Sequence, residues 1–313
     1  MRYAAVIAAA GLSSRMHEFK PLMCLGENTV IENVIHSLRN GGVGEISLVA
    51  GYKADILQRH VQPLEVNVCV NPIYAETKML DSLKMGISNL KEPYDYVFLT
   101  PGDVPLVKPE TIRLMGELGE KIVRPMCGER YGHPILLSSQ LIPSLMEYNG
   151  EDGLRGAIAN LGEKIYNLKV DDVGVLLDAD TPEDFKALRK QSAKLRSGGR
   201  LWPDIRIHIA KGDTVLTPEA AQFLEMIEHT GSIQGACACM HKSYSYGWRR
   251  LNQMEEELGY QLVERFPGGA SGGGSLLTEK GGRLLKAYQE FQSELREISE
   301  ELFKRKFTDD LHG

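Results

Sequence analysis

The stretch that decides the fold of this chain is YAAVIAAAGLSSRM at residues 3–16, followed by Lys20. An apolar run that ends in a loop of glycine and serine is typical of a parallel strand leading into a phosphate-binding turn, because small residues let backbone N–H groups approach an anion. Arg15 can bind phosphate oxygens through two parallel hydrogen bonds, and Lys20 supplies a compact positive charge. The loop has neither the Gly-Lys-Ser/Thr ending of a Walker loop nor the Gly-x-Gly-x-x-Gly dinucleotide motif. An ordinary strand-to-helix turn with two solvated cations is the alternative interpretation.

The composition is that of an ordinary globular protein with room for two domains. The 313 residues are 42% apolar and 25% charged, with a formal net charge of −6. The longest apolar run, near Val6, is too short to span a bilayer, and no signal-peptide cleavage pattern follows it. We therefore expect a cytoplasmic protein without a membrane partner. The cysteines form no C-x-x-C pair, so neither a zinc site nor a disulfide framework is expected. They are Cys24, Cys69, Cys127, Cys237 and Cys239.

Residues 1–190 alternate between strand-like and helix-like segments. Near-continuous apolar strands separated by helices predict an α/β fold, with a mainly parallel sheet that helices cover on both faces. Such sheets bind ligands at the carboxyl ends of their strands. The expected strands cover residues 4–9, 45–50, 66–70, 96–100, 121–125, 135–137, 165–169 and 175–177.

Two aspartates, Asp103 and Asp180, follow strand-like segments and are expected at this ligand edge. A carboxylate in that position can hold Mg²⁺ against phosphate oxygens. Taken alone, each aspartate could equally belong to a turn or a helix cap, where Asp is common. Together with Arg15 and Lys20 on a parallel sheet, the pair predicts a metal-assisted phosphate site.

Four motifs resemble, in this order, those of the molybdenum-cofactor nucleotidyltransferases. They are AAAGLSSRM at 8–16 with KPL at 20–22, GDVP at 102–105, GHP at 132–134 and DADTPED at 178–184. The resemblance spans residues 1–190 and implies a Rossmann-like nucleotide-diphosphosugar transferase sheet. It also implies transfer of a nucleoside monophosphate from an NTP to a phosphate-bearing acceptor, with release of pyrophosphate. In the most similar members the acceptor is the molybdopterin cofactor, and the alanine-rich start of the loop favours CTP over GTP.

The resemblance also implies roles for single residues. Arg15, Lys20 and Asp103 would be catalytic, since nucleotidyl transfer depends mainly on positioning and on neutralising phosphate charge. Asp103 and Asp180 would hold Mg²⁺ as Lewis acid and template. Ser82, with Asn71 and Met79, falls in the segment that borders the base and the acceptor. The implied nucleotide-binding set is Ala9, Ala10, Gly11, Ser13, Arg15, Lys20, Ser82, Gly102 and Asp103.

Two residues depart from the family pattern. His17 stands where the family has glycine after Arg-Met, so the loop conformation or its phosphate contacts could differ. Lys78 stands where glycine usually precedes the methionine, and it adds a cation near the expected acceptor. His133 is interpreted as a structural residue at the start of a strand rather than as a catalyst.

Residues 191–204 are polar, basic and contain a glycine pair, which predicts a linker. Beyond it, three capped helix signals, a glycine-rich hairpin and a long last helix predict a mainly α winged helix-turn-helix domain over residues 205–313. This region resembles the DNA-binding domain of the molybdate-responsive LysR-like regulators. The resemblance rests on GSI at 231–233, SYSYGW at 243–248, LVER at 262–265 and the glycines of 268–274.

A winged helix places its third helix in the major groove of DNA. Residues 200–313 contain 14 Lys and Arg against 17 Asp and Glu, so only a local face, near residues 241–250, is basic. An interaction module that binds no DNA is therefore the alternative. The expected DNA-binding residues are Lys242, Ser243, Tyr244, Ser245, Arg249 and Arg250.

The last helix carries apolar residues at heptad-like spacing, which suits a two-helix contact in a homodimer. The alternative is a single amphipathic helix that packs on its own domain. The residues are Leu284, Tyr288, Phe291, Leu295, Ile298 and Leu302.

The sequence as a whole predicts a bifunctional protein. Its first part would transfer CMP, rather than GMP, from an NTP to the phosphate of molybdopterin cofactor with Mg²⁺, and its second part would be a DNA-binding transcription-regulator domain. One alternative is a nucleotidyltransferase for another phosphate acceptor, such as a sugar phosphate. The other is a transcription regulator that binds a nucleotide as effector without turnover.

Overall fold

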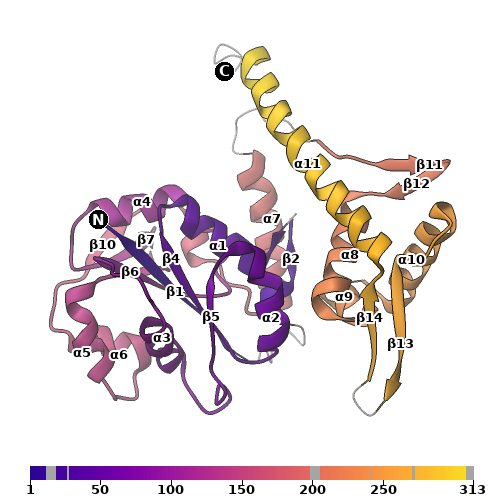
Figure 1. Ribbon diagram of the computed structural model, residues 1–313. Coiled ribbons are helices and arrows are strands. Elements are labelled where there is room, and N and C mark those ends of the chain that lie inside the picture. The colour runs from indigo at the N-terminus through magenta and orange to yellow at the C-terminus, as the bar shows by residue number, and fades with distance from the viewer. Residues whose placement is uncertain (12–18, 27, 198–204, 241, 270–271, 308–313) are drawn as a thin grey trace. The chain divides into compact units, whose positions relative to one another are not determined.

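The computed structural model describes residues 1–11, 19–26, 28–197, 205–240, 242–269 and 272–307. It divides into two compact units, Met1–Ser192 and Ala193–Gly313 (Figure 1). The predicted loop residues Ser13, Arg15 and His17 lie outside the described residues.

The N-terminal unit is built on one mixed sheet with the strand order β10-β7-β9-β6-β1-β4-β5. The central strand β1 pairs in parallel with β4 and β6, whereas β9 is antiparallel to both of its neighbours. The predicted α/β fold with a mainly parallel sheet is confirmed. The strands of this sheet are β1 (Tyr3–Ala9), β4 (Glu45–Ala50), β5 (Asn67–Val70), β6 (Tyr96–Pro101), β7 (Ile122–Cys127), β8 (Arg130–Tyr131), β9 (Ile135–Ser138) and β10 (Tyr166–Lys169). The short strand β8 pairs with β7. A separate small hairpin consists of β2 (Cys24–Leu25) and β3 (Asn28–Thr29).

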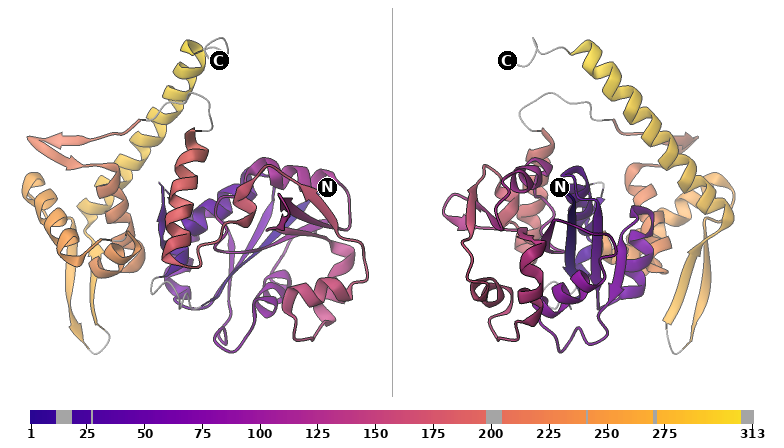
Figure 2. Two further views of the ribbon diagram at one scale, coloured as in Figure 1. Left: turned by 180° about the vertical axis from the view of Figure 1, so that it is seen from behind. Right: turned by 60° about the vertical axis from the view of Figure 1, so that its left-hand side comes forward.

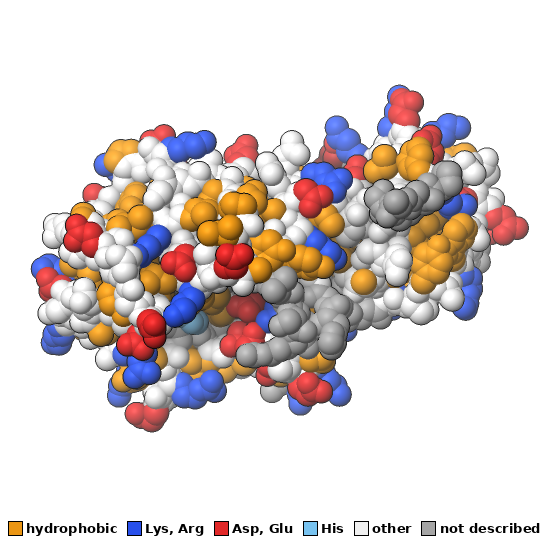
Figure 3. Space-filling view, turned by 90° about the horizontal axis from the view of Figure 1, so that it is seen from below, with side chains coloured by type: hydrophobic (Ala, Val, Ile, Leu, Met, Phe, Trp, Pro, Cys, Tyr) orange, Lys and Arg blue, Asp and Glu red, His pale blue; other side chains and the backbone are white. Residues whose placement is uncertain are grey.

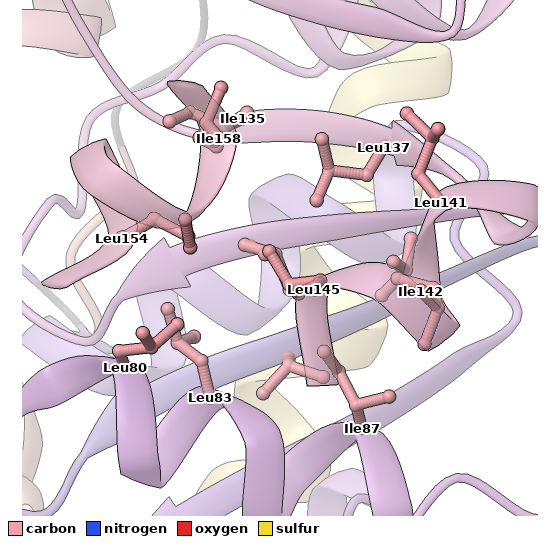
Figure 4. Packing of buried hydrophobic residues seen from close by; sticks show 14 of the residues in the cluster. Leu80, Leu83, Ile87, Ile135, Leu137, Leu141, Ile142, Leu145, Leu154 and Ile158 are labelled. Atoms are coloured by element: carbon pink, nitrogen blue, oxygen red, sulfur yellow. The ribbon is translucent and has the colours of Figure 1, made fainter. Parts of the chain in front are cut away.

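Helices cover both faces of this sheet because successive strand side chains point to opposite sides. On β6, Val97 and Leu99 join a cluster with helices α3, α5 and α6, whose side chains point toward one another in Figure 4. On the other face, Thr100 lies among side chains of α1 and α4. The helices of this unit are α1 (Val30–Asn40), α2 (Ala54–Val61), α3 (Met79–Ser88), α4 (Pro109–Glu117), α5 (Ile142–Glu147), α6 (Gly153–Asn160) and α7 (Pro182–Ser197).

One expectation about this unit was wrong. Residues expected as a strand at 175–177 lie instead in and just after a short 3-10 helix, Val173–Leu176. The Asp172 side chain accepts a hydrogen bond from the Gly174 N–H at 3.0 Å, and a Cβ at Gly174 would clash with the Leu106 carbonyl, so the chain turns tightly here. The linker predicted for 191–204 begins as helix, since α7 continues to Ser197. Residues 191–197 are mostly good helix formers, and the boundary between the two units, after Ser192, falls within the predicted linker.

The C-terminal unit contains the three expected helices, the hairpin and a long last helix, with a further hairpin in front that the sequence did not predict (Figures 1 and 2). Each helix starts at a side-chain cap, from Thr217, Ser232, Ser243 and Thr278. The elements are β11 (Ile209–Lys211), β12 (Asp213–Leu216), α8 (Pro218–Thr230), α9 (Ile233–Cys239), α10 (Tyr244–Leu258), β13 (Val263–Gly269), β14 (Gly272–Leu277) and α11 (Glu279–Lys306).

The core of this unit forms where α8, α9 and α10 meet. Phe223, Cys237 and Leu251 are buried, and a Cβ at Gly247 would clash with the Cys237 sulfur, so glycine lets α10 pack closely on α9. The start of α11 also belongs to this core, because Tyr288 is buried and its hydroxyl donates to the Ile207 carbonyl at 2.8 Å.

Candidate functional site

The candidate active site lies at the carboxyl ends of β1 and β6. These strands are paired in parallel with Ala8 opposite Pro101, and the Gly102 N–H donates to the Ala8 carbonyl at 2.9 Å. A Cβ at Gly102 would lie only 2.9 Å from the Ala9 Cβ, so a larger residue would push the two strand ends apart. Glycine here therefore lets β6 deliver Asp103 beside the loop that follows β1.

Lys20 joins the two predicted metal-binding carboxylates. Its ammonium lies 2.7 Å from Asp180 Oδ1 and 3.5 Å from Asp103 Oδ2, and its side chain is only 12% exposed. The Ala179 N–H donates to the Asp103 carbonyl at 3.0 Å, which holds the 178–180 segment against the end of β6. Burial raises the pKa of Asp178, and the neighbouring carboxylates of Asp180 and Asp103 raise it further. The site thus concentrates negative charge around one ammonium.

The donor set fits a divalent cation shared with phosphate groups. Among the described residues, no group of three or more Asp, Glu, His or Cys side chains is arranged to hold a metal alone. Asp103 and Asp180 nevertheless converge on one cationic group, the Lys20 ammonium. One or two carboxylates completed by substrate phosphates is the usual way in which Mg²⁺ is bound by proteins that use nucleotides.

A first pocket of about 240 Å³ opens at this edge of the sheet. Seven predicted nucleotide-binding residues line it: Ala9, Ala10, Gly11, Lys20, Ser82, Gly102 and Asp103. Tyr74, Thr77 and Lys78 also line it, and they were not in the predicted set.

Buried Asn71 organises the segment that supplies these additional residues. The Asn71 amide donates to Thr77 Oγ at 2.8 Å and to Ser82 Oγ at 3.3 Å, while its carbonyl oxygen accepts from the Ile73 N–H. An asparagine directly after a strand and before a helix was the available signal for this loop. The hydrogen bond from Asn71 to Ser82 helps to position Ser82 at the pocket.

A second pocket of about 630 Å³ adjoins the first, and Lys78 and Met79 line both. Its floor is largely apolar, and its charged residues include Arg124 and Arg155. The Arg124 guanidinium lies 3.6 Å from the centre of the Tyr131 ring. Figure 3 shows a hollow on this unit with a histidine side chain between basic and acidic ones. The residues that line this pocket are spread from position 78 to position 165, so no local sequence pattern predicts it.

His133 lines the second pocket and is mostly buried. Its backbone N–H donates to the Val175 carbonyl at 2.9 Å, which fits the structural role predicted for it. Burial lowers the pKa of its imidazole, although the Asp103 charge opposes this shift. Nδ1 is buried and has no hydrogen-bond partner among the described residues. Because the ring is neutral at pH 7, Nδ1 can still accept or donate one hydrogen bond.

In the C-terminal unit, the predicted DNA-binding residues gather at the start of α10. Lys242, Ser243, Tyr244, Ser245 and Arg249 are exposed, whereas Arg250 is half-buried. Ser243 accepts from the Tyr246 N–H as the helix cap, and Arg250 donates to the Val215 carbonyl at 3.3 Å. Ser243 and Arg250 thus also have structural contacts within the unit.

Lys242 is held by an acidic neighbour. Its ammonium lies 2.7 Å from Glu219 Oε1 and 4.8 Å from the centre of the Tyr246 ring. The hydrogen bond from Lys242 lowers the pKa of Glu219, so this carboxylate is ionised at neutral pH. The local basic face is therefore weaker than the sequence suggested.

One carboxylate and one guanidinium connect the hairpin β13–β14 to α10. Glu255 Oε1 accepts from the N–H groups of Leu262 and Val263 at 2.7 and 3.1 Å, and its other oxygen lies 3.3 Å from Arg265. The Arg265 guanidinium also lies 4.1 Å from the centre of the Trp248 ring. These contacts fix the hairpin relative to the helix that precedes it, and the sequence analysis missed them.

The apolar residues of α11 fall into two groups. Tyr288 is buried within the unit, which agrees with the alternative prediction of an amphipathic helix that packs on its own domain. Phe291, Ile298 and Leu302 are 46%, 59% and 44% exposed. The second half of the helix thus presents apolar side chains that its own unit leaves uncovered in the described residues.

Comparison with known protein families identifies both units. The model of the MobA-like NTP transferase domain matches residues 5–165, about half of the chain. This chain belongs to the MobA-like NTP transferase family. Its C-terminal unit contains a helix-turn-helix region of the bacterial regulatory LysR type, matched at residues 218–282. The predicted fusion of a nucleotidyltransferase to a regulator-type helix-turn-helix is confirmed.

Individual relatives agree with this division. The molybdenum cofactor cytidylyltransferase of Escherichia coli K12 is 27% identical over 192 residues, which cover 61% of this chain and 97% of the relative. The molybdenum transport protein ModE of Azotobacter vinelandii is 37% identical over 93 residues, but the match spans only 34% of that protein. Among solved structures, Rv0371c from Mycobacterium tuberculosis H37Rv has a TM-score of 0.54 and 25% identity, covering 61% of this chain and 98% of its own.

Within the described residues, no helix is both long enough and apolar enough to cross a bilayer.

Proposed function

We propose that the N-terminal unit transfers CMP from CTP to the phosphate of molybdopterin cofactor and releases pyrophosphate. The observation that carries this proposal is the arrangement of Lys20, Asp103 and Asp180 at the carboxyl edge of the sheet, beside a pocket lined by seven residues of the predicted nucleotide site. The similarity to a molybdenum cofactor cytidylyltransferase supports the choice of base and acceptor.

In this proposal, an oxygen of the acceptor phosphate attacks the α-phosphorus of CTP, and the bond to pyrophosphate breaks. No general base is needed, because a phosphate monoester is already ionised at neutral pH. Lys20 neutralises charge on the α-phosphate and on the leaving pyrophosphate. Asp103 and Asp180 hold Mg²⁺, which supplies Lewis-acid assistance when bound. The triphosphate is bound by the loop that follows β1, through Gly11, Ser13 and Arg15.

The acceptor occupies the second pocket in this proposal. That pocket adjoins the first, so an acceptor bound there can reach the α-phosphate. Its mixture of an apolar floor and charged rim residues suits a heteroaromatic compound that carries a phosphate.

The decisive experiment measures pyrophosphate release by the full chain with Mg²⁺, molybdopterin cofactor, and CTP, GTP or ATP in turn. We expect release with CTP, loss of release in Asp103→Ala, and retained activity in Lys164→Ala, whose exposed lysine lies outside both pockets. Release with a sugar phosphate instead would identify a different acceptor. Nucleotide binding without release from any acceptor would favour a nucleotide-responsive regulator.

We further propose that the C-terminal unit binds DNA as a homodimer in the cytoplasm. The exposed start of α10 and the apolar second half of α11 support this part. Fluorescence anisotropy with genomic DNA fragments, together with light scattering of the same sample, tests it. A monomeric mass, or binding that Arg249→Ala and Ser245→Ala leave unchanged, would contradict it.

A further inference from the structure

In the part of the N-terminal unit that the structure describes, Lys78 and Met79 are the residues that line both pockets. We propose that Lys78 binds the phosphate of the acceptor and thereby restricts the second pocket to phosphorylated acceptors. This inference rests on the proposed function, because it specifies how the acceptor is recognised in the same site.

The backbone of Lys78 is held firmly at the start of α3. Its N–H donates to Asp81 Oδ2 at 2.8 Å, and its carbonyl accepts from the Asp81 N–H at 3.1 Å. The Cα position is therefore fixed between the pockets, and only the flexible side chain has to move in order to meet a ligand.

The charge of Lys78 is not neutralised by its contacts among the described residues. Its ammonium donates to the Glu151 carbonyl at 3.0 Å, and this oxygen is uncharged. No ion pair involves Lys78 in the part of the chain that the structure describes. An exposed ammonium that is bonded only to a carbonyl can exchange that bond for a stronger, charge-assisted bond to a phosphate oxygen.

The other cations of the second pocket are placed less well for this role. Arg124 stacks on Tyr131 and donates to Asn167 at 2.9 and 3.2 Å, and neither it nor Arg155 lines the first pocket. Among the described residues, Lys78 is thus the basic residue that lines both the first and the second pocket.

The proposed reaction needs such a cation. The attacking phosphate of the acceptor and the triphosphate of the donor are both anions, and they have to approach until an oxygen of one contacts the α-phosphorus of the other. A positive charge between them offsets this repulsion. Lys20, which lies with Asp103 and Asp180, serves the donor, and Lys78 serves the acceptor.

The test compares two ligands on the full chain: a pterin with a phosphomonoester on its side chain, and the same pterin with a free hydroxyl. Their dissociation constants follow from the quenching of pterin fluorescence. Lys78→Gln keeps a hydrogen-bond donor for the Glu151 carbonyl but removes the charge. It therefore tests the effect of the charge on phosphate binding apart from the hydrogen bond to Glu151. We expect the phosphorylated pterin to bind about 10- to 100-fold more weakly to this variant, the loss typical of one charged hydrogen bond, and the alcohol to bind as before.

Lys84→Gln is the matched control. Lys84 is also on α3 and donates to the Tyr148 carbonyl of the same neighbouring segment, but it lines neither pocket. We expect it to bind both pterins like the wild-type protein, and we expect Lys78→Arg to retain the preference for the phosphorylated one.

Three results would overturn the inference. These are equal weakening of both pterins by Lys78→Gln, equal effects of the Lys78 and Lys84 variants, and no preference of the wild-type protein for the phosphorylated pterin. Its failure differs from failure of the proposed function. If CMP transfer occurs and the KM of the acceptor is unchanged in Lys78→Gln, only the inference fails. If binding depends on Lys78 but no pyrophosphate is released, only the proposed reaction fails.

Discussion

Replacing Lys20 with methionine removes the ammonium from the candidate active site and keeps a side chain of similar length. The Lys20 side chain is 12% exposed, and its ammonium lies 3.5 Å from Asp103 and 2.7 Å from Asp180, so little water screens it. If it contacts the α-phosphate in the transition state, its loss costs about 3–4 kcal/mol, as for one donor of an oxyanion hole. We therefore expect kcat/KM for CMP transfer to fall about 100- to 1000-fold.

The same substitution should also have a second effect, opposite in direction to the loss of turnover: it should strengthen metal binding. A lysine with only a structural role would not give this result. Without its ammonium, Asp103 and Asp180 lose the cation that they share, so a divalent ion meets less competition. Binding of Mn²⁺ in the absence of nucleotide, followed by electron paramagnetic resonance, should become tighter in Lys20→Met while turnover falls. Lys164→Met, at an exposed position, controls for the general effect of a lost lysine. Turnover within threefold of wild type, or weaker Mn²⁺ binding, would refute the reasoning.

Three further predictions concern other parts of the chain. Burial alone would raise the pKa of Glu32, but hydrogen bonds and charge from His60, together with hydrogen bonds from Thr29 at the N-cap of α1, lower it to about 2. Stability should therefore be fully present above pH 4.5 and fall by about 3 kcal/mol toward pH 2; chemical denaturation at several pH values should show this loss, and Glu32→Gln should lack it. Glu219→Gln should strengthen DNA binding and make log K fall more steeply with log salt by about 0.9, because the carboxylate no longer competes with phosphate for Lys242; an unchanged slope in anisotropy titrations speaks against this contact. Ile298→Glu should give a monomer in light scattering with an unchanged circular dichroism spectrum, since this side chain is 59% exposed within its unit; a dimer that persists excludes the second half of α11 as the interface.

The sequence predicted the sheet well because its signals there are local. The apolar runs of β1 and β6 each end at small residues, and both strands lie where they were expected. Asp103 was assigned to the ligand edge from its position after β6 alone, and the parallel pairing of β6 with β1 brings it there. Capped helices in the C-terminal unit were equally predictable, since Thr217 and Ser232 announce them within a few residues.

The missed features depend on contacts between residues far apart in the sequence. The tight turn at Gly174 follows from the nearby Leu106 carbonyl, which no pattern around residue 175 contains. The restraint of Lys242 by Glu219 joins the first turn of α8 to the segment before α10. The second pocket likewise needs α3, β7 and α6 together before it exists. A single sequence shows which residues are available at such places, but not which of them meet.

The electrostatics of the C-terminal unit connect the two proposals made for it. Residues 200–313 carry more acidic than basic residues, and Glu219 reduces the charge that Lys242 offers. One copy of α10 therefore presents few cations to phosphate groups, and the affinity of such a surface for DNA falls steeply as salt rises. Two copies joined through Ile298 and its neighbours on α11 would double the number of phosphate contacts and fix their spacing, as dimeric helix-turn-helix proteins do on paired half-sites. Dimerisation and DNA binding should accordingly be lost together in Ile298→Glu, and an operator with two half-sites should be bound much more tightly than a single half-site.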